Sequence, residues 1–212
     1  MPILAVSTSG AVATAALVRE DRCICARAAG TDKRHAETVF PLIERLLLEA
    51  DTPLSAVGLF AVDVGPGSFT GVRIGVSAVN AMAAAQGKRV VAVSSLRAVY
   101  RANAGISDRV CILLDAGNGN GYAAQYVGGR EFVPPEAVVA RPYLDALPEN
   151  MAVVTDFEAG GGTPLIPAAE DVGREAHLLR DTAVAAAMPL YLRPSQAERM
   201  WKLRQEAGRD VH

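Results

Sequence analysis

The chain has 212 residues, of which 50% are hydrophobic and 21% are charged, and this composition excludes an intrinsically disordered protein. The formal net charge of −2 and the lack of an obvious basic patch argue against a protein that holds nucleic acid on its own. No apolar run approaches the ~20 residues that cross a bilayer, and no signal peptide is recognisable, so we expect a cytoplasmic protein without a membrane segment.

The first third of the chain predicts three short strands followed by a helix. Two turn-forming pairs, Ser9-Gly10 and Glu20-Asp21, separate the apolar runs and favour a meander. The strands are expected at Pro2–Ser7, 11–18 and 23–28.

The three cysteines are interpreted as small buried hydrophobic residues. Cys23 and Cys25 stand two residues apart, so on a strand they would share one face and would be poorly placed to bridge each other. Together with Cys111 and three scattered histidines they offer too few ligands for a zinc site. The sequence therefore predicts no metal site.

A helix is predicted over residues 35–50, with Asp32 as a candidate N-cap and Pro41 either kinking the helix or marking its first turn. Its apolar stripe is wider than the ~100° face that a surface helix hides against its own core. We therefore expect another protein to cover part of this stripe. The apolar residues are Val39, Phe40, Leu42, Ile43, Leu46, Leu47 and Leu48.

The elements that follow complete a recognisable order. A strand at 57–62, a glycine-rich loop, a helix at 69–86 and a strand at 89–93 give β-β-β-α-β-α-β, which is the order of a ribonuclease H-like half-domain. The second half repeats this order in abbreviated form. Its strands are expected at 110–114, 122–127, 131–133 and 152–155, with helices beyond the prolines of 134–147 and at 171–187.

Two such halves in tandem predict an α/β chain with the actin-like, Hsp70-like (ASKHA) fold, in which a cleft separates two ribonuclease H-like lobes. We assign residues 1–103 to the first lobe and residues 104–195 to a second, abbreviated lobe. Residues 196–212 form a polar C-terminal tail.

The stretch VGPGSFTGVRIG, residues 64–75, lies between a strand and a helix but matches neither the Walker nor the dinucleotide-binding spacing. Gly67, Gly71 and Gly75 recur every four residues, so on a helix they form one smooth face that another backbone can approach closely. Two interpretations stay open. The glycines serve backbone packing, within the chain or against a partner, or the helix N-terminus binds an anion.

His35 also has two interpretations, as a polar residue at a helix start or as part of an interface. A catalytic triad of Ser68, His35 and Asp63 is disfavoured, because the G-x-S-x-G elbow that would present the serine is absent.

Several stretches together resemble the TsaB (YeaZ) family. They are RHAETVFPLIERLL, GPGSFTGVRIG, VVAVSSLRAV, ILLDAGNGNGYAAQY and PLYLRPSQA, so the resemblance covers most of the chain through Ala197. The family implies the two-lobed actin-like fold and a non-catalytic partner of TsaD, the transferase that makes threonylcarbamoyladenosine beside the tRNA anticodon. It also implies self-association, pairing with TsaD through first-lobe helices, participation of the ATPase TsaE, and contact with tRNA only through the complex.

The resemblance and the wide apolar stripe together predict a partner surface on the first lobe, and no catalytic residue is assigned. The catalytic relatives carry a His-x-x-x-His metal pair, and the resemblance places Ser95 and Val99 at its two positions. Valine cannot ligate a metal, so none is expected. The predicted partner surface comprises His35, Val39, Phe40, Leu42, Ile43, Leu46, Leu47, Gly67, Ser68, Phe69, Gly71, Arg73 and Gly75.

Ser7, Thr8, Ser9 and Asp115 are the candidates for positions near a nucleotide. The family commonly has aspartate where this chain has Ser7, and a hydroxyl is a poor Mg²⁺ ligand, so we expect no cofactor of the chain's own. ATP or ADP would then be bound only in the assembled complex. Asp115 is either a turn-former or a ligand, and Gly117 replaces the family's usual arginine nearby. The alternative function is an actin-like ATPase or small-molecule kinase that uses Asp115 and the loops DAGNGNG and AGGG.

Overall fold

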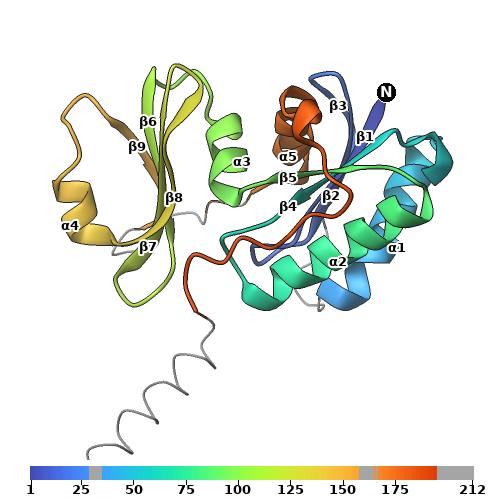
Figure 1. The fold of residues 1–212 in the computed structure, drawn as a ribbon, viewed down its shortest axis with the longest axis horizontal. Coiled ribbons are helices and arrows are strands. Elements are labelled where there is room, and N and C mark those ends of the chain that lie inside the picture. The colour runs from blue at the N-terminus through green and yellow to red at the C-terminus, as the bar shows by residue number, and fades with distance from the viewer. Residues whose placement is uncertain (29–34, 158–164, 166, 195–212) are drawn as a thin grey trace, which may run out of the picture.

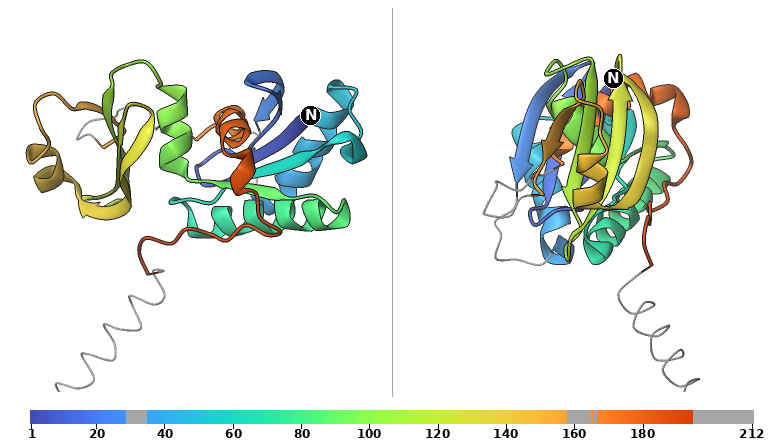
Figure 2. Two further views of the ribbon diagram at one scale, coloured as in Figure 1. Left: turned by 45° about the horizontal axis from the view of Figure 1, so that its top comes forward. Right: turned by 90° about the vertical axis from the view of Figure 1, so that its left-hand side faces the viewer.

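The computed structural model describes residues 1–28, 35–157, 165 and 167–194. Two sheets form two lobes, and two helices lie between them (Figures 1 and 2). Among the described residues, no helix is both long and apolar enough to cross a membrane.

The first lobe is a five-stranded sheet in the order β3-β2-β1-β4-β5. The first three strands pair antiparallel, whereas β4 and β5 run parallel to β1, as expected for a ribonuclease H-like lobe. The predicted order of elements is confirmed. The bounds are β1 Pro2–Ser7, β2 Thr14–Arg19, β3 Arg22–Ala28, α1 His35–Glu49, η1 Leu54–Ala56, β4 Leu59–Asp63, α2 Phe69–Ala85 and β5 Val90–Val93.

The second lobe repeats this order without a fifth strand, as β8-β7-β6-β9, with β6-β7-β8 antiparallel and β9 parallel to β6. This repetition confirms the predicted actin-like fold of two ribonuclease H-like lobes. The bounds are β6 Arg109–Asp115, β7 Asn120–Val127, β8 Arg130–Val139, α4 Ala140–Asp145 and β9 Ala152–Thr155.

Strand β8 corrects the prediction of a helix beyond the prolines. The strand continues through Pro134 and Pro135, and only the six residues of α4 are helical. Proline is tolerated here because β8 is an edge strand and needs no N–H donor on its free side. A bulge adds to this tolerance, because a single β7 residue, Ala124, lies opposite both prolines.

A second bulge corrects the expected placement of the cysteines. Leu17 pairs with Cys25 but Val18 pairs with Cys23, so Ile24 is the extra residue of β3. Cys25 therefore packs against the core beneath α1, and Cys23 packs against the core on the opposite face of the sheet. The prediction that the two share a face was wrong because the alternation of side chains fails at a bulge.

Each of the two helices between the lobes packs on the sheet of the other lobe, not on the sheet that it follows in the chain. Helix α3, Ser95–Ala102, packs Leu96 and Val99 into the core of the second sheet. Helix α5, Ala169–Leu178, packs Val172 and Ala176 against the first sheet, opposite α1 and α2. Residues 169–190 thus lie on the first lobe, whereas the sequence placed 104–195 in the second.

The helix predicted at 171–187 ends at Leu178, and a short 3-10 turn, Arg180–Thr182, follows. Beyond it, residues 183–191 form an extended segment, the strap, that crosses the first lobe beside α2 (Figure 1). The N–H and C=O of Val184 pair with those of Val90 at 2.8 Å each, along the outer edge of β5. The helix ends early because these backbone groups pair with β5 instead.

Asn80 on α2 holds the middle of the strap. Its side-chain amide donates to Ala187 O and accepts from Ala187 N, both at 2.9 Å. We expect Asn80→Ala to lower the free energy of unfolding by about 1–2 kcal/mol, because the buried backbone groups of Ala187 lose both partners. Urea unfolding measures this, with Ser77→Ala on the exposed face of α2 as the control. Equal stabilities of the two variants would contradict the assignment.

Candidate functional site

One buried carboxylate lies where the first lobe meets α3. Asp63 ends β4 and is fully buried. Its Oδ1 accepts hydrogen bonds from Ser95 Oγ at 2.6 Å and Gly65 N at 2.9 Å. Its Oδ2 accepts from Ser7 Oγ at 2.8 Å and from Ser9 Oγ. These five residues are called the Asp63 cluster.

Four donors fill the lone-pair positions of a carboxylate, so Asp63 has no oxygen left for a metal ion. Burial raises the pKa of Asp63, and the hydrogen bonds from Ser9, Ser95, Gly65 and Ser7 oppose that rise by favouring the charged form. The cluster is therefore a closed structural unit. The sequence analysis missed it, although a buried strand ending in Asp and entering a glycine loop was a visible signal.

The triad that the sequence disfavoured does not form. Ser68 Oγ accepts from Gly71 N at 3.2 Å as the N-cap of α2. His35 Nε2 lies 2.9 Å from Gly10 O, and Asp63 is occupied within its cluster. His35 thus fastens the start of α1 to the loop after β1.

The candidates near a nucleotide separate into two pairs. Ser7 and Thr8 are buried, and Thr8 Oγ1 donates to Gly71 O at 2.7 Å. Neither side chain reaches a ligand site, so the prediction for these two is corrected. Ser9 and Asp115 do line a common cleft.

The repeating glycines pack against the chain itself. A Cβ added at Gly67 would lie 2.6 Å from Ser9 O. One at Gly71 would overlap Thr8 O, and one at Gly75 would overlap the Thr8 hydroxyl, both within 3.0 Å. Gly71 and Gly75 are buried by this approach, so their assignment to a partner surface is corrected; Gly67 is exposed.

Anion binding at the start of α2 finds less support than backbone packing. The N–H of Ser68 donates to Ser9 O at 2.7 Å, and the N–H of Gly71 donates to the capping hydroxyl. Two of the donors that would face an anion are thus already bound within the chain.

Most of the apolar stripe of α1 is also covered by the first lobe. Val39, Leu42, Ile43 and Leu46 are buried in the core shared with α2, so these four are not available to a partner. Their assignment is corrected because α1 turns its broad face onto the sheet. What remains outside is narrower: Leu47 is half-buried, Phe40 is 51% exposed and Leu48 is 75% exposed.

An aromatic and cationic group lies at the start of α2. The rings of Phe69 and Tyr191 are 4.7 Å apart, and the Arg73 guanidinium lies 3.9 Å from the Phe69 ring centroid. Arg73 Nε also donates to Tyr191 Oη at 2.7 Å. These three residues form the aromatic–arginine patch. The sequence analysis missed Tyr191, since only tertiary structure brings the strap to α2.

The positions assigned to the metal pair do not fit a metal ion. Ser95 donates to Asp63, and Val99 is buried in the core of the second lobe. Across the residues that the structure describes, no group of three or more His, Cys, Asp or Glu side chains is placed to hold an ion.

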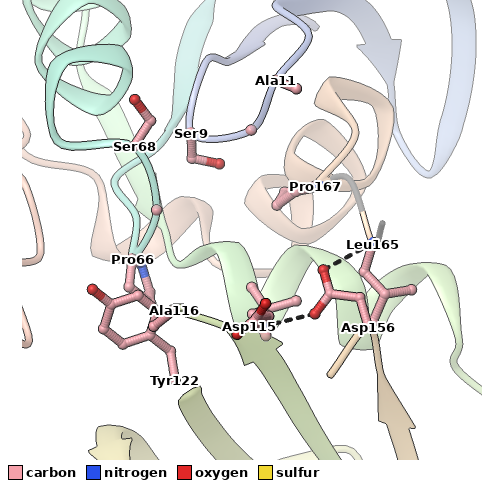
Figure 3. A pocket seen from close by; sticks show the side chains of 13 residues that line it. Ser9, Ala11, Pro66, Ser68, Asp115, Ala116, Tyr122, Asp156, Leu165 and Pro167 are labelled. Atoms are coloured by element: carbon pink, nitrogen blue, oxygen red, sulfur yellow. Dashed lines mark hydrogen bonds between the residues drawn. The ribbon is translucent and has the colours of Figure 1, made fainter. Parts of the chain in front are cut away.

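The cleft between the lobes has a volume of about 380 Å³ and is acidic (Figure 3). Asp156 accepts from Asp115 N at 2.7 Å and from Leu165 N at 3.2 Å, so both of its oxygens are bonded. Asp115 Oδ1 accepts from Gly117 N at 2.8 Å, which supports its interpretation as a turn-former. No Lys, Arg or His belongs to the described residues that line this acidic cleft.

Comparisons with known proteins agree on one family. A sequence model of the TsaD family, tRNA N6-adenosine threonylcarbamoyltransferase, matches residues 29–152. The tRNA threonylcarbamoyladenosine biosynthesis protein TsaB of Bacillus subtilis (strain 168) is 32% identical over 154 residues, covering 71% of this chain and 67% of that protein. TsaB of Escherichia coli (strain K12) is 28% identical over 231 residues, covering 95% and 97%.

A solved structure extends the likeness to three dimensions. YeaZ from Pseudomonas aeruginosa superposes with a TM-score of 0.74 at 28% identity, covering 90% of this chain and 99% of that one. The two-lobed arrangement is therefore shared along nearly the whole chain.

We expect Gly71→Ala to destabilise the fold by about 2 kcal/mol, because the new methyl group overlaps the backbone of Thr8, which cannot move as a side chain tip can. Without this overlap, alanine would stabilise the helix by about 1 kcal/mol relative to glycine. The sign of the change in unfolding free energy therefore shows whether the overlap or the helix propensity is the larger effect. The measurement is chemical unfolding of the Gly71→Ala variant. The Thr70→Ala variant is the control, because Thr70 is exposed. A stabilised Gly71→Ala protein would refute the close approach.

We expect Asp63→Ala to cost at least about 3 kcal/mol of unfolding free energy, since four donors lose their acceptor. Asp63→Asn should cost less, because the hydroxyls of Ser7 and Ser9 can rotate to accept from the new amide. Denaturant midpoints of the two variants test this order, and an alanine variant as stable as the asparagine variant would contradict it.

Proposed function

We propose, since the chain belongs to the TsaB (YeaZ) family of proteins related to TsaD, that it serves tRNA threonylcarbamoyladenosine modification as a non-catalytic partner of the TsaD transferase. The observation that best supports the proposal is that Ser95 has a structural role. At the position where the catalytic relatives are taken to hold a metal ligand, this side chain is buried and donates to Asp63. A group with that structural task is not free to take part in chemistry.

The docking surface that we propose is smaller than the one the sequence suggested. Helices α1 and α2 lie side by side over one face of the first sheet (Figure 1). Their outward residues include Phe40, Leu48 and the aromatic–arginine patch. Aromatic and arginine side chains are the residues that most often carry binding energy at protein interfaces. This surface would bind TsaD or a second copy of the chain, while TsaE and tRNA would join through the assembled complex, with ATP or ADP bound there.

An actin-like ATPase or kinase stays the second candidate, because Asp115 and Asp156 lie in a cleft between two lobes. Two features oppose it. Each oxygen of Asp156 already accepts a hydrogen bond from a backbone N–H group, and none of the described lining residues carries a positive charge for phosphates. A nucleotide would meet two carboxylates there without a compensating side chain.

We expect Arg73→Glu to weaken binding to TsaD by about tenfold or more, since it reverses the charge and removes the contacts to Phe69 and Tyr191. A mixture of this variant with TsaD should show a loss of tRNA modification activity that follows the loss of binding. Sedimentation of mixed proteins and a modification assay make the measurements. Arg89→Glu, an exposed charge reversal elsewhere on the lobe, is the matched control.

Equal TsaD binding by both variants would remove the proposed surface. Turnover of Mg-ATP by the isolated chain, lost on Asp115→Asn, would favour the kinase over the partner role.

A further inference from the structure

A second hollow lies between the lobes and shares no lining residue with the acidic cleft. Its volume is about 600 Å³. The start of α3, the β7–β8 turn region and the strap form its walls. Apolar side chains, among them Met188, Pro189 and Leu190 of the strap, make up one side. Val64, Leu179 and the end of β5 complete the walls, which come from segments that only the folded chain brings together.

Two arginines bring unused donors to this hollow. Arg97 Nε donates to Glu175 Oε1 at 2.6 Å, which leaves the terminal N–H groups of Arg97 without a partner among the described residues. Arg130 is exposed at the rim and makes no hydrogen bond or ion pair to the described part of the chain. A guanidinium with free N–H groups in a partly enclosed site favours a carboxylate or phosphate.

A buried phenol lies beside Arg97 in the core of the second lobe. Tyr126 is fully buried and does not line the hollow. Its ring stacks on Tyr100 at 4.2 Å and lies 5.2 Å from the Arg97 guanidinium. These ring contacts help to hold the Arg97 guanidinium in place at the wall of the hollow.

Helix α3 begins at the same wall. Ser94 caps it by accepting from Arg97 N at 3.2 Å, and the next N–H groups of the first turn carry the positive end of the helix dipole. Two carboxylates weigh against an anion here: Glu131 lines the hollow, and Glu175 partly neutralises Arg97. Because these carboxylates offset part of the positive charge, we expect a simple inorganic anion to bind weakly. A larger anion could also contact the apolar wall.

We propose that this hollow binds a small organic anion, whose carboxylate or phosphate oxygens face Arg97 and Arg130 while its apolar part lies against the strap. The site differs from the docking surface on α1 and α2, and its occupancy does not require TsaD. It also gives the strap a role, since three of its residues form the apolar wall.

Three probes test the proposal on the full chain without partners, namely inorganic phosphate, benzoate and acetate. Titrations followed by ¹H–¹⁵N NMR should shift signals of residues around Ser94, Gly129 and Leu190, with benzoate binding more tightly than acetate because of the apolar wall. Arg130→Gln should weaken phosphate binding by about fivefold, and Glu131→Gln should strengthen it by a similar factor.

The exposure of Arg130 and Glu131 separates binding from folding. Both side chains are exposed, so the two variants should leave the free energy of unfolding unchanged and alter only anion binding. Arg89→Gln, outside the hollow, is the control and should change nothing. Equal affinities in all variants, signal shifts elsewhere on the surface, or no binding at about 50 mM phosphate and benzoate would each overturn the proposal.

Discussion

The buried carboxylate of Asp63 is the constraint on which the first lobe depends. A charge removed from water must be compensated, and here four donors from three separate segments converge on one side chain. Ser7 and Ser9 fix the loop after β1, Gly65 fixes the entrance to the glycine loop, and Ser95 fixes the start of α3. The loop after β1 then supplies Thr8, whose backbone oxygen packs against Gly71 of α2 and whose side chain packs against Gly75.

This arrangement explains why residue types that suggest chemistry perform structural tasks. Ser95 and Val99, where the sequence resemblance suggested the positions of a metal pair, belong to the Asp63 cluster and to the second core. Asp156 binds two backbone N–H groups, and Asp115 closes a turn. With the Asp63 cluster closed, the outward features of α1 and α2 include exposed apolar and aromatic side chains such as Phe40 and Leu48, which suits a partner subunit.

The two lobes are joined by an exchange of helices rather than by a linker alone. α3 follows the first sheet but packs on the second, α5 follows the second sheet but packs on the first, and the two helices contact each other. The Arg97–Glu175 pair crosses this contact, with Glu175 1% exposed. Such a pair restricts how the lobes move apart, because breaking it would strand a buried charge. The acidic cleft and the second hollow, which share no lining residue, are chemically different spaces.

The sequence by itself determined the order of elements from β1 to β5, the bounds of β1 and nearly all of α1 and α2, and hence the fold class, because hydrophobic periodicity and turn chemistry are local properties. It also indicated that Gly67, Gly71 and Gly75 serve a close approach. Only the tertiary structure decided that the approach is to the chain's own Thr8 and Ser9, and that α1 buries Val39, Leu42, Ile43 and Leu46. It also decided that bulges separate Cys23 from Cys25 and admit Pro134 and Pro135. It alone decided the lobe of α5 and the strap that brings Tyr191 to Arg73. Those outcomes depend on which distant segment supplies the packing surface or the hydrogen-bond partner, and no local pattern in a single sequence records that choice.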